Sequence, residues 1–138
     1  VTMENITLWY SENGPRIKTY PNNTGLVSNI VYRNIRLNDV QRGIFINGEY
    51  CPISQSPYPC PPGQNSVLIE NIVFEDIQGS VNNGVVGQFN CSSLNPCRNI
   101  SLRDVDLTST STRSPSFHCA YISGPEAVSV SPRSCINY

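Results

Sequence analysis

The sequence predicts an all-β fold in which short strands stack as the coils of a solenoid, and three observations lead to this prediction. Charged residues make up only 14% of the chain, while Ile, Val, Asn, Ser, Gly and Pro are frequent, as in β-proteins with many turns. A short Asn-Ile pattern recurs along the chain, and turns rich in Gly or Asn separate the strand-like segments. The 138 residues suffice for one domain or for part of a larger one.

The repeat has the form Asn-Ile-x-large apolar, and the three later copies continue in step into a second Asn/Asp-Ile/Val unit. Coils of a solenoid bury their apolar sides only against neighbouring coils, so Ile is expected over Ile and Asn over Asn, with length variation in the loops. A β-sandwich also has short alternating strands, but repetition of the same residue types favours the solenoid. The copies are Asn5-Ile6-Thr7-Leu8, Asn29-Ile30-Val31-Tyr32, Asn71-Ile72-Val73-Phe74 and Asn99-Ile100-Ser101-Leu102.

A second, shorter strand is predicted after each repeat, which gives about four coils. The stretch from Cys51 to Gln64 holds five prolines and is predicted to be a loop, and the segment Thr108–Ser116 is predicted to be an exposed turn. The tail after Ser123 is expected to cap the last coil, whose strand edge would otherwise be bare. The second strands are expected at Arg16–Lys18, Gly43–Ile46, Val85–Phe89 and Ala120–Ile122.

Six cysteines fall into three sequence-local pairs, which predicts disulfides formed in an oxidising compartment. Spacing alone leaves the connectivity open, and our interpretation is Cys51–Cys60, Cys91–Cys97 and Cys119–Cys135. A zinc site would need tighter spacing and histidine partners, and the chain has one histidine. Asn-x-Ser/Thr sequons are typical of a secreted glycoprotein if the source is eukaryotic, and they occur at Asn5, Asn22, Asn90 and Asn99.

Arg16 and Lys18 flank Ile17, so on an extended strand the two cationic side chains leave one face while Ile17 enters the core. Such a fork suits a carboxylate or a phosphate, because Arg offers a planar pair of donors and Lys a compact charge. The alternative is an ordinary solvated strand face. The net charge of −1 gives no support to a general nucleic-acid or membrane surface, so an anion would be bound locally.

The chain resembles the C-terminal part of a polygalacturonase from Val1 to about Leu107, and the Arg-Ile-Lys block with the downstream Tyr50 is the most specific part of the match. The motifs follow in order as Val-x-x-Glu-Asn-Ile, Gly-x-Arg-Ile-Lys-Thr, Gly25-Leu26-Val27-Ser28-Asn29-Ile30-Val31-Tyr32-Arg33-Asn34-Ile35 and Gly43-Ile44-Phe45-Ile46. This resemblance implies a right-handed parallel β-helix, secretion into a cell wall and hydrolysis of pectin. It implies that Arg16 and Lys18 bind substrate beside the cleaved bond, with Tyr50 next to them.

The sequence departs from this family at the catalytic acids. Inverting glycosidases need a general acid and a general base that are separated widely enough to admit a water. In the family these carboxylates lie in an Asn-Thr-Asp segment and an Asp-Asp pair, followed by Gly-His-Gly, all before Arg-Ile-Lys, and none of the three motifs occurs here. Residues 1–138 are therefore expected to be the C-terminal portion of one β-helix domain, with no catalytic residue and no activity alone.

An N-terminal fragment of the same β-helix is the expected partner, and pectin or polygalacturonate the expected ligand. A non-catalytic pectin-binding or structural β-helix is the alternative. No metal or organic cofactor is expected, since acid/base hydrolysis needs none.

The acids that are present suit structural roles better than catalysis. Asp104 and Asp106 share a strand face, but Asp104 is in register with Asp76 and Asn34, and a repeated position is better explained by stacking. Glu49 is expected to be an exposed loop acid, and the adjacent Glu75 and Asp76 are expected to point to opposite faces. His118 is expected to be a structural histidine.

Overall fold

The computed structural model describes residues 1–54, 56, 58–60, 63–125 and 127–136, and every regular element within them is a β-strand. None of these residues belongs to a helix long and apolar enough to cross a membrane. The strands are β1 (Thr2–Trp9), β2 (Arg16–Lys18), β3 (Leu26–Val40), β4 (Ile44–Asn47), β5 (Leu68–Val81), β6 (Val85–Asn90), β7 (Arg98–Ser109), β8 (Ser116–Ala120) and β9 (Ala127–Ser131).

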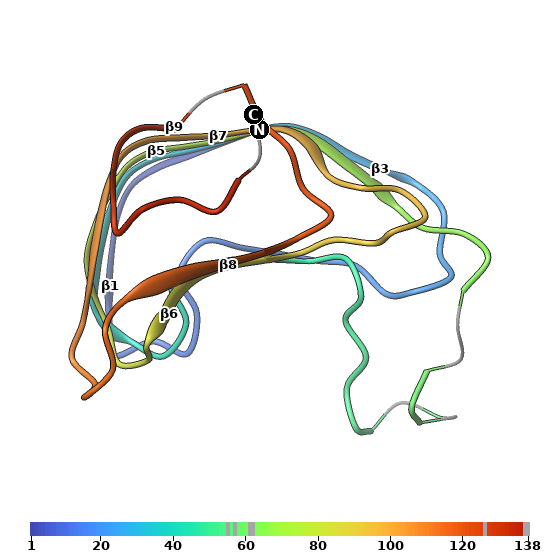
Figure 1. Ribbon diagram of the computed structural model, residues 1–138, viewed down its shortest axis with the longest axis horizontal. Helices are drawn as coiled ribbons and strands as arrows, with labels where there is room; N and C mark the ends of the chain where they lie inside the picture. Colours follow the sequence, from blue (N-terminus) through green and yellow to red (C-terminus); the bar gives the residue numbers. More distant parts are fainter. Residues whose placement is uncertain (55, 57, 61–62, 126, 137–138) are drawn as a thin grey trace.

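The strands form two parallel sheets, which we call the long sheet (order β1-β3-β5-β7-β9) and the short sheet (order β2-β4-β6-β8). One strand of each sheet makes a coil, and successive coils overlie one another in Figure 1, where the long sheet bends around one side of the core and the short sheet lies opposite. This arrangement confirms the prediction of a stacked, all-β parallel β-helix.

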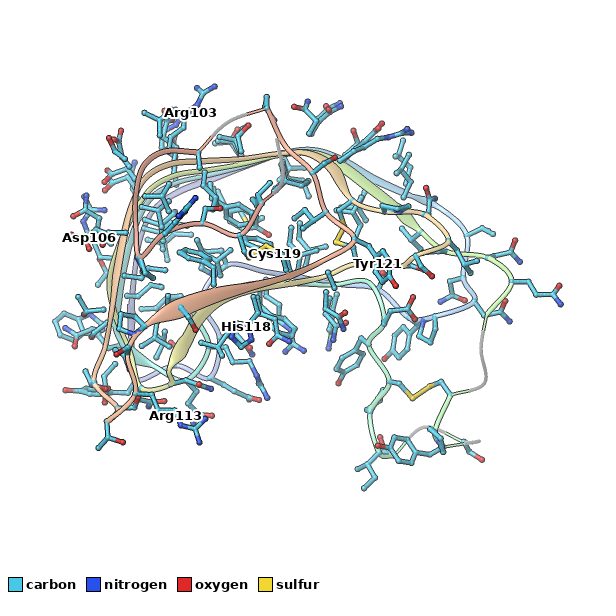
Figure 2. All side chains as sticks on the ribbon, in the orientation of Figure 1. Arg103, Asp106, Arg113, His118, Cys119 and Tyr121 are labelled. Atoms are coloured by element: carbon cyan, nitrogen blue, oxygen red, sulfur yellow. A yellow bond between two sulfur atoms is a disulfide. The ribbon has the colours of Figure 1, made fainter. Side chains whose placement is uncertain are left out.

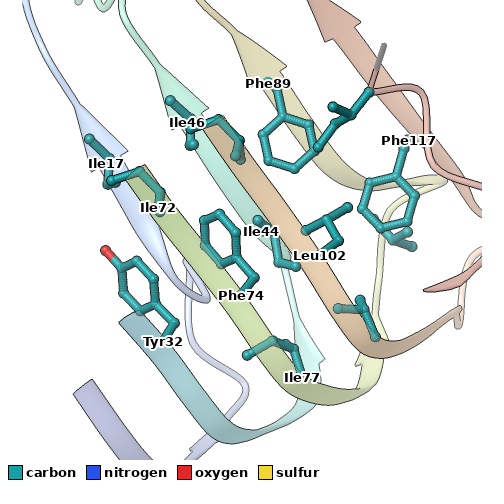
Figure 3. Packing of buried hydrophobic residues seen from close by; sticks show 14 of the residues in the cluster. Ile17, Tyr32, Ile44, Ile46, Ile72, Phe74, Ile77, Phe89, Leu102 and Phe117 are labelled. Carbon is teal, nitrogen blue, oxygen red and sulfur yellow. The ribbon is translucent and has the colours of Figure 1, made fainter. Parts of the chain in front are cut away.

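The interior is filled by columns of like residues, because strands stacked in parallel place equivalent side chains over one another. Ile35 lies in register with Ile77, and Ile77 with Val105. The rings of Tyr32 and Phe74 stack with centroids 5.1 Å apart. In the short sheet, Phe89 and Phe117 stack at 6.2 Å (Figure 3). Such columns bury nearly all the large apolar side chains of the inner coils and supply most of the hydrophobic stabilisation.

The long strands turn corners at residues with left-handed backbone, and these residues stack from coil to coil. Asn and Asp tolerate positive φ better than other residues with a Cβ, which explains why they recur at these positions. Side-chain hydrogen bonds join neighbours, from Asn34 Nδ2 to Asn5 Oδ1 (2.6 Å) and from Asn99 Nδ2 to Asn71 Oδ1 (2.5 Å). One corner ladder contains Asn5, Asn34, Asp76, Asp104 and Ser129, and the other contains Asn29, Asn71 and Asn99.

The register corrects the predicted repeat in the first coil. Asn5 stacks on Asn34, with Ile6 on Ile35, and therefore does not correspond to Asn29. The three later copies align as predicted. Both repeat units begin with Asn-Ile, so composition alone does not tell one corner from the other.

One prediction at the C-terminal end also needs correction. The fourth short strand is Ser116–Ala120 instead of Ala120–Ile122, because the ring of Phe117 sets its register by stacking on Phe89 and Tyr121 then takes a left-handed backbone. The tail, whose periodicity is weak, adds β9 to the long sheet.

Disulfides connect Cys51 to Cys60, Cys91 to Cys97 and Cys119 to Cys135, as in our interpretation of the three sequence-local pairs. The last of them ties the tail to β8, and Ile136 of the tail is buried as part of the hydrophobic core. Pro57, Pro61 and Pro62 of the predicted loop lie outside the described residues.

The corner ladder predicts different outcomes for two substitutions of Asn71, which has a φ of 56°. Asn71→Ala removes a hydrogen bond worth about 1 kcal/mol and puts a Cβ residue into left-handed backbone at a further cost of about 1 kcal/mol. Asn71→Gly loses the same hydrogen bond without that strain, so about half the destabilisation is expected. Denaturant unfolding of both variants measures the difference, and equal losses would contradict a role for the left-handed backbone.

Candidate functional site

The cationic fork is formed at β2, the first strand of the short sheet. Ile17 is only 7% exposed and belongs to the core, so its neighbours Arg16 and Lys18 point outward. Both cations lie over one ring, with Arg16 Cζ 5.3 Å and Lys18 Nζ 4.6 Å from the centroid of Tyr50. The structure thus brings together the three residues predicted to bind substrate.

Arg16 is held from two sides. Its guanidinium also lies 5.3 Å from the ring centroid of Phe45, the residue beside it on β4. On the inner side, the buried Tyr32 hydroxyl donates a hydrogen bond to the Arg16 carbonyl oxygen (3.2 Å), and burial raises the pKa of Tyr32, which keeps this donor protonated. The Arg16 Nε is buried and has no hydrogen-bond partner among the described residues, as is also true of Asn13 Oδ1 and Thr19 Oγ1.

Tyr50 is fixed by backbone and ring contacts. Its amide donates to the carbonyl of Thr19 at 3.0 Å, which places the loop beside the end of β2. The ring of Tyr20 meets it edge-on at 5.4 Å, and the next residue, Cys51, is anchored by its disulfide. The phenol presents a ring for a sugar face and a hydroxyl for hydrogen bonding.

The cations of the fork differ in their surroundings from most arginines of the chain. Arg33 bridges Glu4 (3.4 Å) and Glu75 (3.2 Å), and other ion pairs join Arg36 to Asp76, Arg42 to Glu12 and Arg98 to Glu70. No carboxylate among the described residues pairs with Arg16 or Lys18, so both charges are available to an anion. The described residues also include no cluster of His, Cys, Asp or Glu suited to a metal ion.

Asp104 and Asp106 lie on the long sheet, whereas the fork lies on the short sheet. Asp104 occupies a corner ladder, as expected from its register, and Asp106 faces outward beside Gln78 in a shallow polar groove (Figure 2). Glu49 is exposed in the loop before Tyr50, which agrees with its expected role as a loop acid.

Glu75 and Asp76 do not point to opposite faces as expected. The left-handed backbone of Asp76 interrupts the alternation of the strand, so both carboxylates reach the surface. There they form ion pairs with Arg33 and Arg36 respectively.

His118 is exposed on the outer face of β8, where its Nε2 lies 3.3 Å from Ser116 Oγ, and it is not enclosed as a structural histidine would be. Sequence reasoning also missed Phe45, Asn47 and Gln88, which flank the fork on neighbouring strands. A signal was present, since stacking Ile17 on Ile46 by their shared pattern puts Phe45 beside Arg16 and Asn47 beside Lys18.

The four sequon asparagines occupy different environments. Asn5 and Asn99 belong to corner ladders, and the Nδ2 of Asn99 is engaged with Asn71. Asn22 is exposed in a turn where its Oδ1 accepts a hydrogen bond from the Gln64 amide. Asn90 ends β6, in register with Asn47.

Comparison with known proteins gives matches along nearly the whole chain. Residues 1–135 match the family model described as glycosyl hydrolases family 28. A polygalacturonase of Prunus persica is 34% identical over 137 residues, covering 99% of this chain and 34% of the relative. A probable polygalacturonase of Arabidopsis thaliana is 38% identical over 107 residues, covering 78% of this chain and 23% of the relative.

An exopolygalacturonase of Rhizopus delemar is 34% identical over 119 residues, covering 85% of this chain and 32% of the relative. The chain therefore spans between about a quarter and a third of the length of these relatives. The parallel β-helix and the match of the family model to residues 1–135 establish that this chain belongs to glycosyl hydrolases family 28.

Proposed function

We propose that this chain is the C-terminal part of a secreted, polygalacturonase-like hydrolase and that its fork holds a galacturonate unit of pectin beside the bond to be cleaved. The observation that carries the proposal is the pair of cations, Arg16 and Lys18, that share the ring of Tyr50 and have no acidic partner among the described residues. A galacturonate offers a carboxylate to the cations and a ring face and hydroxyls to the phenol. The two relatives are named as a probable polygalacturonase and a polygalacturonase, and these names agree with a galacturonate ligand.

Hydrolysis requires a pair of acids, and the described residues place no such pair near the fork. The candidate pair Asp104 and Asp106 lies on the other sheet, and Glu49 is a single exposed loop acid. An inverting mechanism needs two carboxyl groups on opposite sides of the glycosidic bond. The proposal therefore assigns substrate binding to this chain and the acid and base to an N-terminal part of the same β-helix.

The first coil has a surface suited to that N-terminal part. Among the described residues β1 pairs only with β3, and β2 only with β4, so both present an edge that can accept another parallel strand. An open apolar pocket lies at this end of the stack, lined by Met3, Ile6, Leu8, Pro15, Tyr32 and Ile35 among others. A further coil of the same fold would cover these side chains and continue both sheets.

The disulfides support a secreted protein, since such bonds persist in oxidising compartments. Of the four predicted N-glycosylation sites, the surroundings favour Asn22. Its side chain is exposed and its amide nitrogen makes no hydrogen bond within the described structure, whereas the Nδ2 of Asn99 is used in the corner ladder.

Arg16→Gln and Lys18→Gln are each expected to weaken binding of digalacturonate by about ten- to a hundredfold, because each removes a charge-assisted interaction of about 1.5 to 3 kcal/mol. Arg98→Gln is the matched control, since Arg98 pairs with Glu70 on the long sheet. Isothermal titration calorimetry measures the affinities. Unchanged binding by both fork variants would remove the basis of the proposal.

A second prediction follows from assigning the catalytic acid and base to an N-terminal part of the β-helix. Intact-mass analysis of native material should find a co-purifying polypeptide that carries them, and the complex should release reducing ends from polygalacturonate. This chain in isolation should bind the polymer without cleaving it. A stable lone chain that binds pectin, with no partner in the native material, would instead support the alternative of a non-catalytic binding protein.

Peptide mapping of the eukaryotically expressed protein should find a glycan on Asn22 and none on Asn99. Loss of the glycan in Asn22→Gln is the check on the first site. A fully occupied Asn99 would show that the corner ladder opens before or during modification.

A further inference from the structure

Among the described residues, the outward side of the short sheet carries no acid over its entire width. Its residues, which we call the short-sheet face, are cationic, amide-bearing, aromatic or small. The residues that alternate with them, such as Ile17, Ile46 and Phe89, point into the core. The short-sheet face consists of Arg16, Lys18, Phe45, Asn47, Gln88, Asn90, Ser116, His118 and Ala120.

The backbone register arranges this face as two columns. Arg16, Phe45, Gln88 and His118 are successive partners across β2, β4, β6 and β8. Parallel strands lie about 4.8 Å apart, so His118 is roughly 14 Å from Arg16 along the column. A linear polymer bound at the fork and aligned with the column therefore meets an amide and then an imidazole.

The position of His118 follows from packing beneath it. A Cβ on Gly87 would lie 2.2 Å from an atom of the Phe117 ring, so the glycine leaves the space in which Phe117 stacks on Phe89. Cys119 is bound to Cys135 on the same inner side. With both neighbours directed inward, the His118 side chain points outward, on the opposite side of the β8 ribbon from Cys119 (Figure 2).

The chemistry of the exposed imidazole matches that of the proposed ligand. Its contact in the described structure is Ser116 Oγ, 3.3 Å from Nε2, and no described carboxylate forms an ion pair with it. An imidazole can donate to a uronate carboxylate or to a sugar hydroxyl, and the Gln88 amide can both donate and accept. A polymer with repeating carboxylates would thus meet cations at one end of the column and an imidazole hydrogen-bond donor at the other.

We propose that the column from Arg16 to His118 binds a galacturonan chain across all four short strands, with Gln88 and His118 as a distal site for sugars beyond the fork. The proposal rests on the proposed function of the fork and adds the course of the polymer. Binding at the distal site should raise the affinity for long oligomers over short ones, because a second contact on one ligand is effectively intramolecular.

The test compares digalacturonate and hexagalacturonate as ligands of the protein as isolated, by isothermal titration calorimetry. The wild type should bind the hexamer more tightly than the dimer. His118→Gln and Gln88→Ala should each weaken hexamer binding about three- to tenfold and leave dimer binding unchanged. His118→Arg should keep the preference for the hexamer, because it retains a hydrogen-bond donor at this position.

Arg133→Gln serves as a matched control, since it removes an exposed cation from the tail that does not belong to the short-sheet face. Equal denaturation midpoints would confirm that the variants are folded. A hexamer affinity unaffected by His118→Gln and Gln88→Ala, or a dimer affinity lowered as much as that of the hexamer, would overturn the distal site while leaving the fork intact. If Arg16→Gln leaves binding of both ligands unchanged, the proposed function itself fails.

Peptide mapping provides an independent check. Asn90 lies beside Gln88 on the short-sheet face, so a glycan there would cover the column. The proposal expects Asn90 to be unmodified in active material. A fully glycosylated Asn90 in protein that binds the hexamer would overturn it.

Discussion

Parallel register between coils is the constraint on which the whole structure depends. Each coil must turn its corner at the same place as the coil below it, or the columns of side chains on every face would lose their partners. Left-handed backbone at Asn and Asp makes the turn, and the hydrogen bonds from Asn34 to Asn5 and from Asn99 to Asn71 lock neighbouring turns together. With the corners aligned, isoleucines stack on isoleucines and aromatic rings stack on rings.

The same register distributes charge between the two sheets. On the long sheet, Glu4, Arg33 and Glu75 are stacked partners, and each exposed ion pair contributes at most about 1 kcal/mol. Besides this small contribution to stability, the ion pairs neutralise charges that would otherwise act on a ligand at a distance. Arg16 and Lys18 have no acid in the same position on the next strand, where Phe45 and Asn47 stand instead.

Much of this architecture could be predicted from the sequence because each coil of a stacked fold repeats the same residue pattern. The Asn-Ile pattern indicated the coils, and the spacing of Arg16 and Lys18 indicated their shared face. The position of Asn5 was misassigned because the two corners use the same residue types, and a choice between them requires the pairing of β1 with β3.

The C-terminal end was predicted less well for a different reason. The start of β8 is decided by a ring that fits over Gly87, which is a contact between residues 30 positions apart and leaves no periodic signal. The outward direction of His118 depends on the same contact. Gln88 and Phe45 became visible as site residues only once the strands were aligned laterally.

The ion-pair ladder of the long sheet has a consequence for behaviour in a gel of anionic polymer. A protein with cations on every side would crosslink such a gel and become immobilised. Here Arg33 is compensated by the acids above and below it, so under the proposed function this part of the long sheet does not compete with the fork for the polymer. Under the proposed function, such local compensation favours one bound strand over a crosslink between two.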